Sequence, residues 1–116
     1  MAARLNPASS AHPIYDPIRP WLERLGDDWP APEALNGLAA GRGLANARGK
    51  PLRFAAPETL APGNYELRVH ETGRIATRPE HRHDLFNALV WLGFPRTKAA
   101  LNALHAGELA REGVQR

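Results

Sequence analysis

The sequence predicts an α+β fold: N-terminal helices, a short antiparallel β-hairpin with a third strand as an alternative, and a C-terminal helical hairpin. Three observations predict this class. Apolar residues recur at helical spacing before residue 41, apolar and polar residues alternate between 65 and 78, and a long helical pattern follows residue 79. A chain of 116 residues can bury one core. We therefore expect a single domain over residues 14–116 and a disordered tail over residues 1–13.

Two N-terminal helices are indicated by apolar spacing and by the placement of prolines. The first is expected from about Pro20 to Leu25, where apolar residues fall on one helical face. The second is expected from Pro32, which suits the first turn of a helix, to about Ala40. The glycine-rich stretch that follows predicts a flexible loop.

The strand signals lie in the middle of the chain. Pro51–Ala56 is short and apolar and predicts an edge strand. Tyr65–His70 alternates apolar with polar residues, as a half-buried strand does. Thr72-Gly73 suits a turn, and Arg74–Arg78 alternates again before Pro79. An antiparallel hairpin of these two segments is the expected arrangement.

The last third of the sequence predicts two consecutive helices. Apolar residues of His83–Leu92 share one broad face, and Gly93 suits a C-terminal cap. Pro95 suits the start of the next helix, expected over Arg96–Ala110. The short connection predicts either a hairpin or a sharp corner. In the second helix, three polar residues share a face: Lys98, Asn102 and His105.

The segment Arg78–His105, RPEHRHDLFNALVWLGFPRTKAALNALH, resembles a bacterial family of uncharacterised proteins, domain of unknown function 3025 (DUF3025). Shorter strings extend the resemblance over about residues 28–105: Asp28-Trp29-Pro30, Leu35-Asn36, Gly49–Phe54, Tyr65-Glu66 and Thr72-Gly73. At Arg82 the family is expected to have an aromatic residue, so no stacking role is carried over to that position. The resemblance implies no particular reaction. Family members continue past the position of His105, which implies a shortened or divergent member.

Composition excludes several functional classes. The chain has no cysteine, which excludes disulfide scaffolds, thiol chemistry and cysteine-ligated zinc. No apolar run approaches the length of a membrane span, and no secretory signal is recognisable, so we expect a cytoplasmic protein with no membrane partner. The net charge of +3 comes from 15 basic and 12 acidic residues. Because most of the basic residues are arginines, the high isoelectric point does not indicate a strongly positive field.

Polar side chains typical of binding sites gather in the two C-terminal helices. If these helices fold back on each other, their polar faces form one groove, which we expect to bind a small anionic ligand or a divalent metal. The candidate ligand-binding residues are Arg78, Asn87, Lys98 and Asn102. The candidate metal ligands, chosen because imidazole and carboxylate suit zinc, manganese or iron, are His81, His83, Asp84 and His105.

Acid–base catalysis in this groove is a further hypothesis, with His83, Asp84 and His105 as catalytic candidates. No nucleophile elbow or HExxH motif is present, so whether the protein is an enzyme is left open. The structural alternative is that Asp84 stabilises a helix N-terminus while Asn87 and Asn102 bridge the two helices.

Two other functional classes are weighed. A helix-turn-helix outline favours nucleic-acid binding, together with a cluster of basic residues: Arg74, Arg78, Arg82, Arg96 and Lys98. The short helix connection and the modest net charge argue against it. The remaining alternative is a protein-interaction module or part of a larger assembly, with self-association as its expected behaviour.

Overall fold

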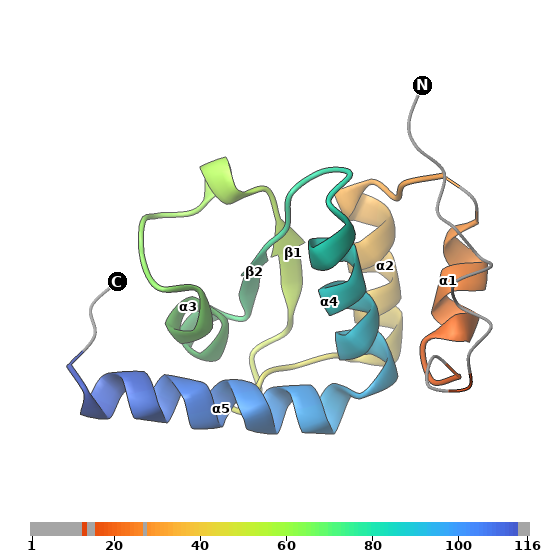
Figure 1. Cartoon of the computed structure of the whole chain (residues 1–116). Helices are drawn as coiled ribbons and strands as arrows, with labels where there is room; N and C mark the ends of the chain where they lie inside the picture. Colours follow the sequence, from red (N-terminus) through yellow and green to blue (C-terminus); the bar gives the residue numbers. More distant parts are fainter. Residues whose placement is uncertain (1–12, 14–15, 27, 114–116) are drawn as a thin grey trace.

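Five α-helices and a small sheet make up the protein in a computed structural model that describes residues 13, 16–26 and 28–113 (Figure 1). Apart from Pro13, the predicted tail lies outside the described residues. In chain order the elements are α1 (Arg19–Leu25), α2 (Pro32–Arg42), β1 (Arg53–Ala55), the 3₁₀ turn η3 (Pro57–Thr59), α3 (Tyr65–Thr72), β2 (Arg74–Ala76), α4 (Arg82–Gly93) and α5 (Pro95–Arg111). The α+β class is confirmed. No helix in the described part of the chain is long and apolar enough to cross a membrane.

The sheet differs from the prediction because its two strands are parallel. β1 pairs with β2 in the register Arg53↔Arg74, Phe54↔Ile75 and Ala55↔Ala76. Parallel strands require a crossover connection, and η3 and α3 provide it between the two strands. The antiparallel hairpin was therefore wrong, although the segments that became β1 and β2 lie within two of the predicted strands.

The predicted strand Tyr65–His70 is instead the body of α3. Asn64 caps this helix, since its Oδ1 accepts a hydrogen bond from the Leu67 backbone N–H at 3.1 Å. Gly73 ends it in the left-handed conformation with φ +80°. A period-2 pattern only six residues long fits one face of a short helix as well. The two caps and the burial of Val69 stabilise the helical conformation of this segment.

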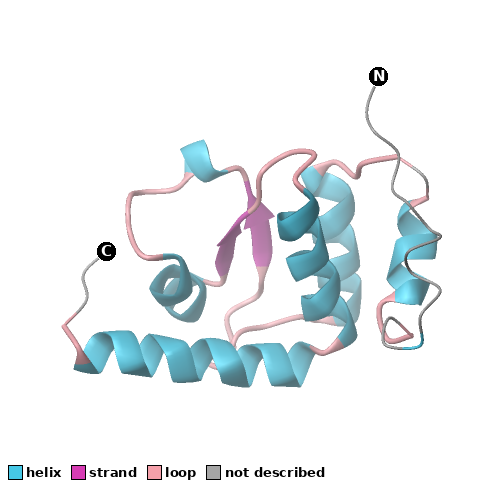
Figure 2. Ribbon diagram, viewed as in Figure 1, coloured by secondary structure: helices cyan, strands magenta, loops and turns pink. Residues whose placement is uncertain are grey.

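The core lies around the sheet, with α3 on one side and α2 and α4 on the other (Figure 2). The largest fully buried side chains come from these elements: Phe54, Val69, Ile75, Trp91 and Leu92. The free edge of β1 is paired by Asn36 of α2, whose Oδ1 accepts from the Phe54 N–H at 2.7 Å and whose Nδ2 donates to the Phe54 carbonyl at 3.0 Å. One asparagine side chain thus satisfies both backbone groups of an edge residue.

Helices α4 and α5 meet at a corner. Figure 1 shows α5 passing beneath both α3 and α4, so it does not fold back along α4 as a helical hairpin would. Gly93 is the last residue of α4 and the cap is Phe94, not Gly93 as predicted. A Cβ at Gly93 would lie 2.9 Å from the Pro17 carbonyl oxygen and from Ile18 Cγ2. The glycine is therefore needed for close packing beside α1.

Candidate functional site

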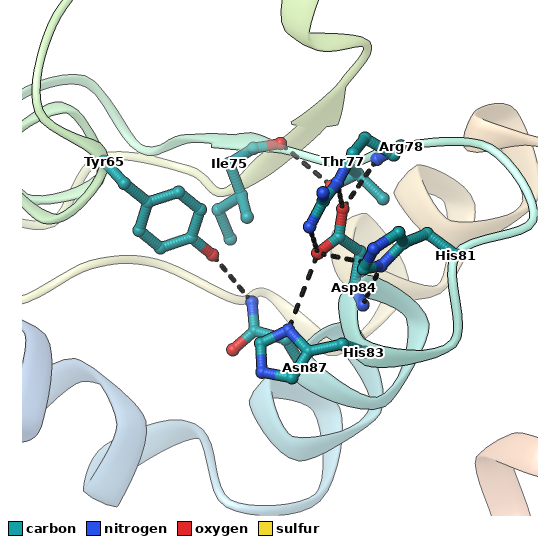
Figure 3. Close-up of polar contacts among 8 residues, drawn as sticks. All are labelled: Tyr65, Ile75, Thr77, Arg78, His81, His83, Asp84 and Asn87. Atoms are coloured by element: carbon teal, nitrogen blue, oxygen red, sulfur yellow. Dashed lines mark hydrogen bonds and ion pairs between the residues drawn. The ribbon is translucent and has the colours of Figure 1, made fainter.

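The predicted polar residues do not share one groove between α4 and α5. They form two groups, one around Asp84 at the start of α4 and one on α5 facing α3. The first group contains Arg78, His81 and His83, and Asn87 lies one turn further along α4 (Figure 3). The second contains Lys98, Asn102 and His105.

Asp84 is held by Arg78. The Arg78 side chain donates from Nε to Oδ2 at 2.8 Å and from Nη2 to Oδ1 at 3.0 Å, and its backbone N–H donates to Oδ2 at 2.9 Å (Figure 3). These hydrogen bonds lower the pKa of Asp84 to about 2 and raise the pKa of Arg78. Asp84 is therefore an ionised, fully engaged carboxylate, and it ties the loop after β2 to α4.

His81 and His83 occupy different positions beside Asp84. His81 is the N-cap of α4, because its Nδ1 accepts from the Asp84 backbone N–H at 3.2 Å. In its neutral form this imidazole therefore carries its proton on Nε2. His83 is 83% exposed, and its Nδ1 lies 3.7 Å from Asp84 Oδ1. Among the described residues, no three His, Cys, Asp or Glu side chains are placed to hold one metal ion.

Asn87 joins α4 to α3 instead of α5. Its Nδ2 donates to the hydroxyl oxygen of Tyr65 at 2.8 Å (Figure 3). Burial raises the pKa of Tyr65 to about 12, with the Glu66 carboxylate adding to the effect. The hydroxyl thus stays protonated at physiological pH, and its own hydrogen remains available to a further acceptor.

The second group lines a small cavity, which we call the α3–α5 pocket. Its volume is about 60 Å³, several times the space one water needs. The floor and walls combine apolar and polar side chains from α3, α4 and α5: Tyr65, Glu66, Val69, Trp91, Lys98, Leu101, Asn102 and His105. Three residues that the sequence nominated for ligand binding or catalysis therefore do meet, but against α3.

Asn102 is the buried polar centre of this pocket. It is only 3% exposed, and its Nδ2 donates to the Glu66 backbone carbonyl at 2.9 Å and to Glu66 Oε1 at 2.7 Å. Its Oδ1 is buried and accepts no hydrogen bond within the described structure. Both partners of Nδ2 are oxygen atoms, which only accept. Exchanging the amide O and N would therefore place an oxygen against these acceptors and lose both hydrogen bonds.

Lys98 brings a half-buried ammonium group to the same pocket. Burial lowers its pKa, and the nearby Glu66 carboxylate partly offsets that effect. The Nζ atom lies 6.0 Å from the centroid of the Trp91 ring, in a cation–π arrangement. Within the described residues, the ammonium makes neither a hydrogen bond nor an ion pair. At the pocket rim, His105 Nδ1 lies 3.8 Å from Glu66 Oε2, an ion-pair distance when the imidazole is protonated.

The sequence reasoning missed Glu66, Tyr65 and Trp91 as parts of this site. Glu66 follows the capping residue Asn64, which signals a helix start. A helix there would have placed the carboxylate in the first turn. Trp91 is a buried core residue, and one part of its surface also lines the pocket. These residues reach the site only through the packing of α3 and α4 on α5.

A second cavity, the loop pocket, lies between the segment before α2 and the loop after β2. Its volume is about 260 Å³, and its walls include Trp29, Pro32, Arg78 and His81. The Trp29 Nε1–H is buried and donates to no partner within the described structure. In the same loop Glu80 adopts φ +49°, which is uncommon for a residue other than glycine. Arg78 and His81, the predicted anion and metal ligands, therefore lie apart from Lys98.

The basic cluster that favoured nucleic-acid binding is not a set of free cations. Arg78 is paired with Asp84, and Lys98 is half-buried over Trp91. Arg74, Arg82 and Arg96 are exposed on three different elements: β2, α4 and the first turn of α5. The α4–α5 corner therefore supplies less positive surface than the sequence suggested.

No curated protein and no solved structure matches the chain significantly. The family model described as "Protein of unknown function (DUF3025)" matches residues 52–116, which is more than half of the chain and includes every residue of the α3–α5 pocket. The expected resemblance is confirmed, and the chain belongs to the DUF3025 family.

Proposed function

We propose that the α3–α5 pocket binds a small molecule through an anionic group that contacts the Lys98 ammonium. The observation that carries this proposal is a half-buried cation without an anionic partner in ion-pair contact, beside a buried amide oxygen without a donor. Removing a charge from water costs free energy unless a partner replaces the lost hydration. A carboxylate or phosphate bound at Nζ would supply that partner.

The surroundings of Lys98 support an anion at this point. The hydroxyl hydrogen of Tyr65 is free to donate, since the oxygen accepts from Asn87. His105 at the rim adds a second positive charge when it is protonated. The apolar surfaces of Val69, Trp91 and Leu101 exclude water from one side, which strengthens the attraction between charges. All of these residues lie within the segment that matches the family.

Lysine NMR tests the proposal directly, because the chain contains only two lysines, Lys50 and Lys98. With ¹³C-labelled lysine, the two side chains give separate signals, and the exposed Lys50 serves as an internal control. Adding propionate or inorganic phosphate is expected to shift the Lys98 signal and raise its titration midpoint, while the Lys50 signal stays unchanged. Equal, unsaturable shifts at both lysines, or no shift at Lys98, would contradict the proposal.

A matched pair of variants separates binding from general charge effects. Lys98→Met keeps most of the length of the side chain and removes the charge, whereas Lys50→Met removes an exposed charge outside the pocket. We expect loss of propionate and phosphate binding only in Lys98→Met, as measured by calorimetric titration. Retained binding in Lys98→Met would remove the basis of the proposal.

A further inference from the structure

The α3–α5 pocket contains a negative side chain as well as a positive one. Glu66 is close enough to Lys98 to influence its pKa, yet no atoms of the two charged groups come within ion-pair distance. Glu66 Oε1 accepts from Asn102, and Oε2 lies 3.8 Å from His105 Nδ1, beyond hydrogen-bond distance. Because a carboxylate can accept about four hydrogen bonds, Glu66 retains unused acceptor capacity.

The buried Oδ1 of Asn102 adds a second unused acceptor. Its Nδ2 donates to two oxygens of Glu66, so the other amide atom, Oδ1, must be an acceptor. Asn102 is only 3% exposed. A ligand that carried only an anionic group would leave this oxygen without a donor, as it is in the ligand-free protein, whereas a ligand with a donor group could satisfy it and gain a hydrogen bond. The pocket therefore suits a ligand that also brings a hydrogen-bond donor.

Resting on the proposed function, we infer that the ligand is a small zwitterion of the α-amino acid type. Its carboxylate would contact Lys98 Nζ and the Tyr65 hydroxyl. Its ammonium group would donate to Asn102 Oδ1 and to the Glu66 carboxylate. One cation and one anion on the protein then face one anion and one cation on the ligand.

The size of the pocket limits the part of the ligand that enters. A cavity of about 60 Å³ is small for a ligand site, so only the head group of the ligand, with at most a short side chain, would enter it. Leu101, an exposed residue at the pocket, marks the side on which a longer side chain would extend into solvent. Glycine and L-alanine are therefore the matching probes.

Three acids of similar size separate the contributions. L-alanine carries an ammonium group, L-lactate carries a neutral hydroxyl donor, and propionate carries neither. We expect calorimetric titration to rank their affinities as alanine, lactate, propionate, with about tenfold between alanine and propionate for one charge-assisted hydrogen bond. Equal affinity for all three would overturn the inference and leave anion binding at Lys98 intact. Binding of none, with the Lys98 NMR signal unmoved, would overturn both.

Glu66→Gln tests the same point from the protein side. Glutamine keeps an oxygen for Asn102 Nδ2 and removes the negative charge. We expect this variant to lose about tenfold in affinity for alanine, while propionate binds as well as before or better. Glu108→Gln, on the exposed surface of α5, is the control and should change neither. Equal losses for alanine and propionate would contradict the inference. If Glu66→Gln fails to fold, the ligand series on the unaltered protein decides alone.

Discussion

The amide nitrogen of Asn102 donates to both the backbone carbonyl and the side-chain Oε1 of Glu66, at 2.9 and 2.7 Å. This pair fastens α5 to the first turn of α3, in a place where water is excluded. It also leaves Asn102 Oδ1 without a donor. The contact that stabilises the helix packing thus also leaves a buried polar atom without a partner, on a residue that lines the pocket.

Asn102→Ala is expected to lower the free energy of unfolding by roughly 1–3 kcal/mol, because the Glu66 acceptors lose their donor in a buried position. Urea denaturation followed by circular dichroism measures this change. Leu104→Ala is the control on the same helix, since Leu104 is 59% exposed and its truncation should cost little. A variant at Asn102 as stable as the Leu104 control would show that the pair contributes nothing to folding.

Lys98→Met is expected to raise the free energy of unfolding at neutral pH while abolishing binding. Burial lowers the pKa of Lys98, so the charged form is less favourable in the folded protein than in the unfolded chain. This penalty is present at neutral pH and fades as the pH rises toward the ordinary lysine pKa, where both states lose the proton. The stability gain of Lys98→Met should therefore shrink in alkaline solution. A variant that is less stable at pH 7, with Lys50→Met unchanged, would contradict the account.

Asp84→Asn is expected to destabilise the protein above about pH 4 by about 1–2 kcal/mol, because it removes the ionised partner of Arg78 near the start of a helix. The folded pKa of Asp84 is lowered to about 2, so its contribution is complete above the ordinary carboxyl pKa. It is lost as the pH falls toward 2. Urea unfolding of both proteins from pH 2 to pH 7 should give curves that converge at the acidic end. Curves that stay parallel would show that the carboxylate charge is not what stabilises this contact.

Gly73→Ala is expected to cost roughly 2–4 kcal/mol, because a Cβ there would clash with the Pro51 carbonyl oxygen and the backbone is left-handed at this position. Gly43 has a similar conformation, with φ +69°, and open space around it. Gly43→Ala should therefore cost only about 1–2 kcal/mol for the backbone conformation alone. Thermal unfolding of both variants separates the steric term from the conformational one. Equal losses of stability in the two variants would show that the backbone at Pro51 moves aside at little cost in free energy.

The sequence predicted the helices better than the sheet or the site. Prolines at the starts of α2 and α5, and the broad apolar face of α4, are local signals that packing did not override. The strand predicted over Tyr65–His70 is wrong because a short alternating pattern fits a helix face as well, and Asn64 and Gly73 cap a helix there. Once α3 is a helix, parallel pairing of β1 and β2 follows from the crossover it provides.

The sequence identified several residues of the candidate site, but it did not predict which helices bring them together. Lys98, Asn102 and His105 share a face of α5, as their spacing indicated, and that face packs on α3. The expected partner was α4, but α4 and α5 meet at a corner, and Gly93 at that corner packs against Pro17 and Ile18. Such a contact joins segments about 75 residues apart, and no local rule reveals it. Glu66, the charge that makes the pocket zwitterionic, could be placed only after the fold was known.

A crystal structure of the protein soaked or co-crystallised with L-alanine tests the central claim most directly. We expect one alanine in the α3–α5 pocket, with its carboxylate within hydrogen-bond distance of Lys98 Nζ and its ammonium group within hydrogen-bond distance of Asn102 Oδ1. A pocket that contains only water at saturating alanine, or an alanine bound with these two ends reversed, would contradict it.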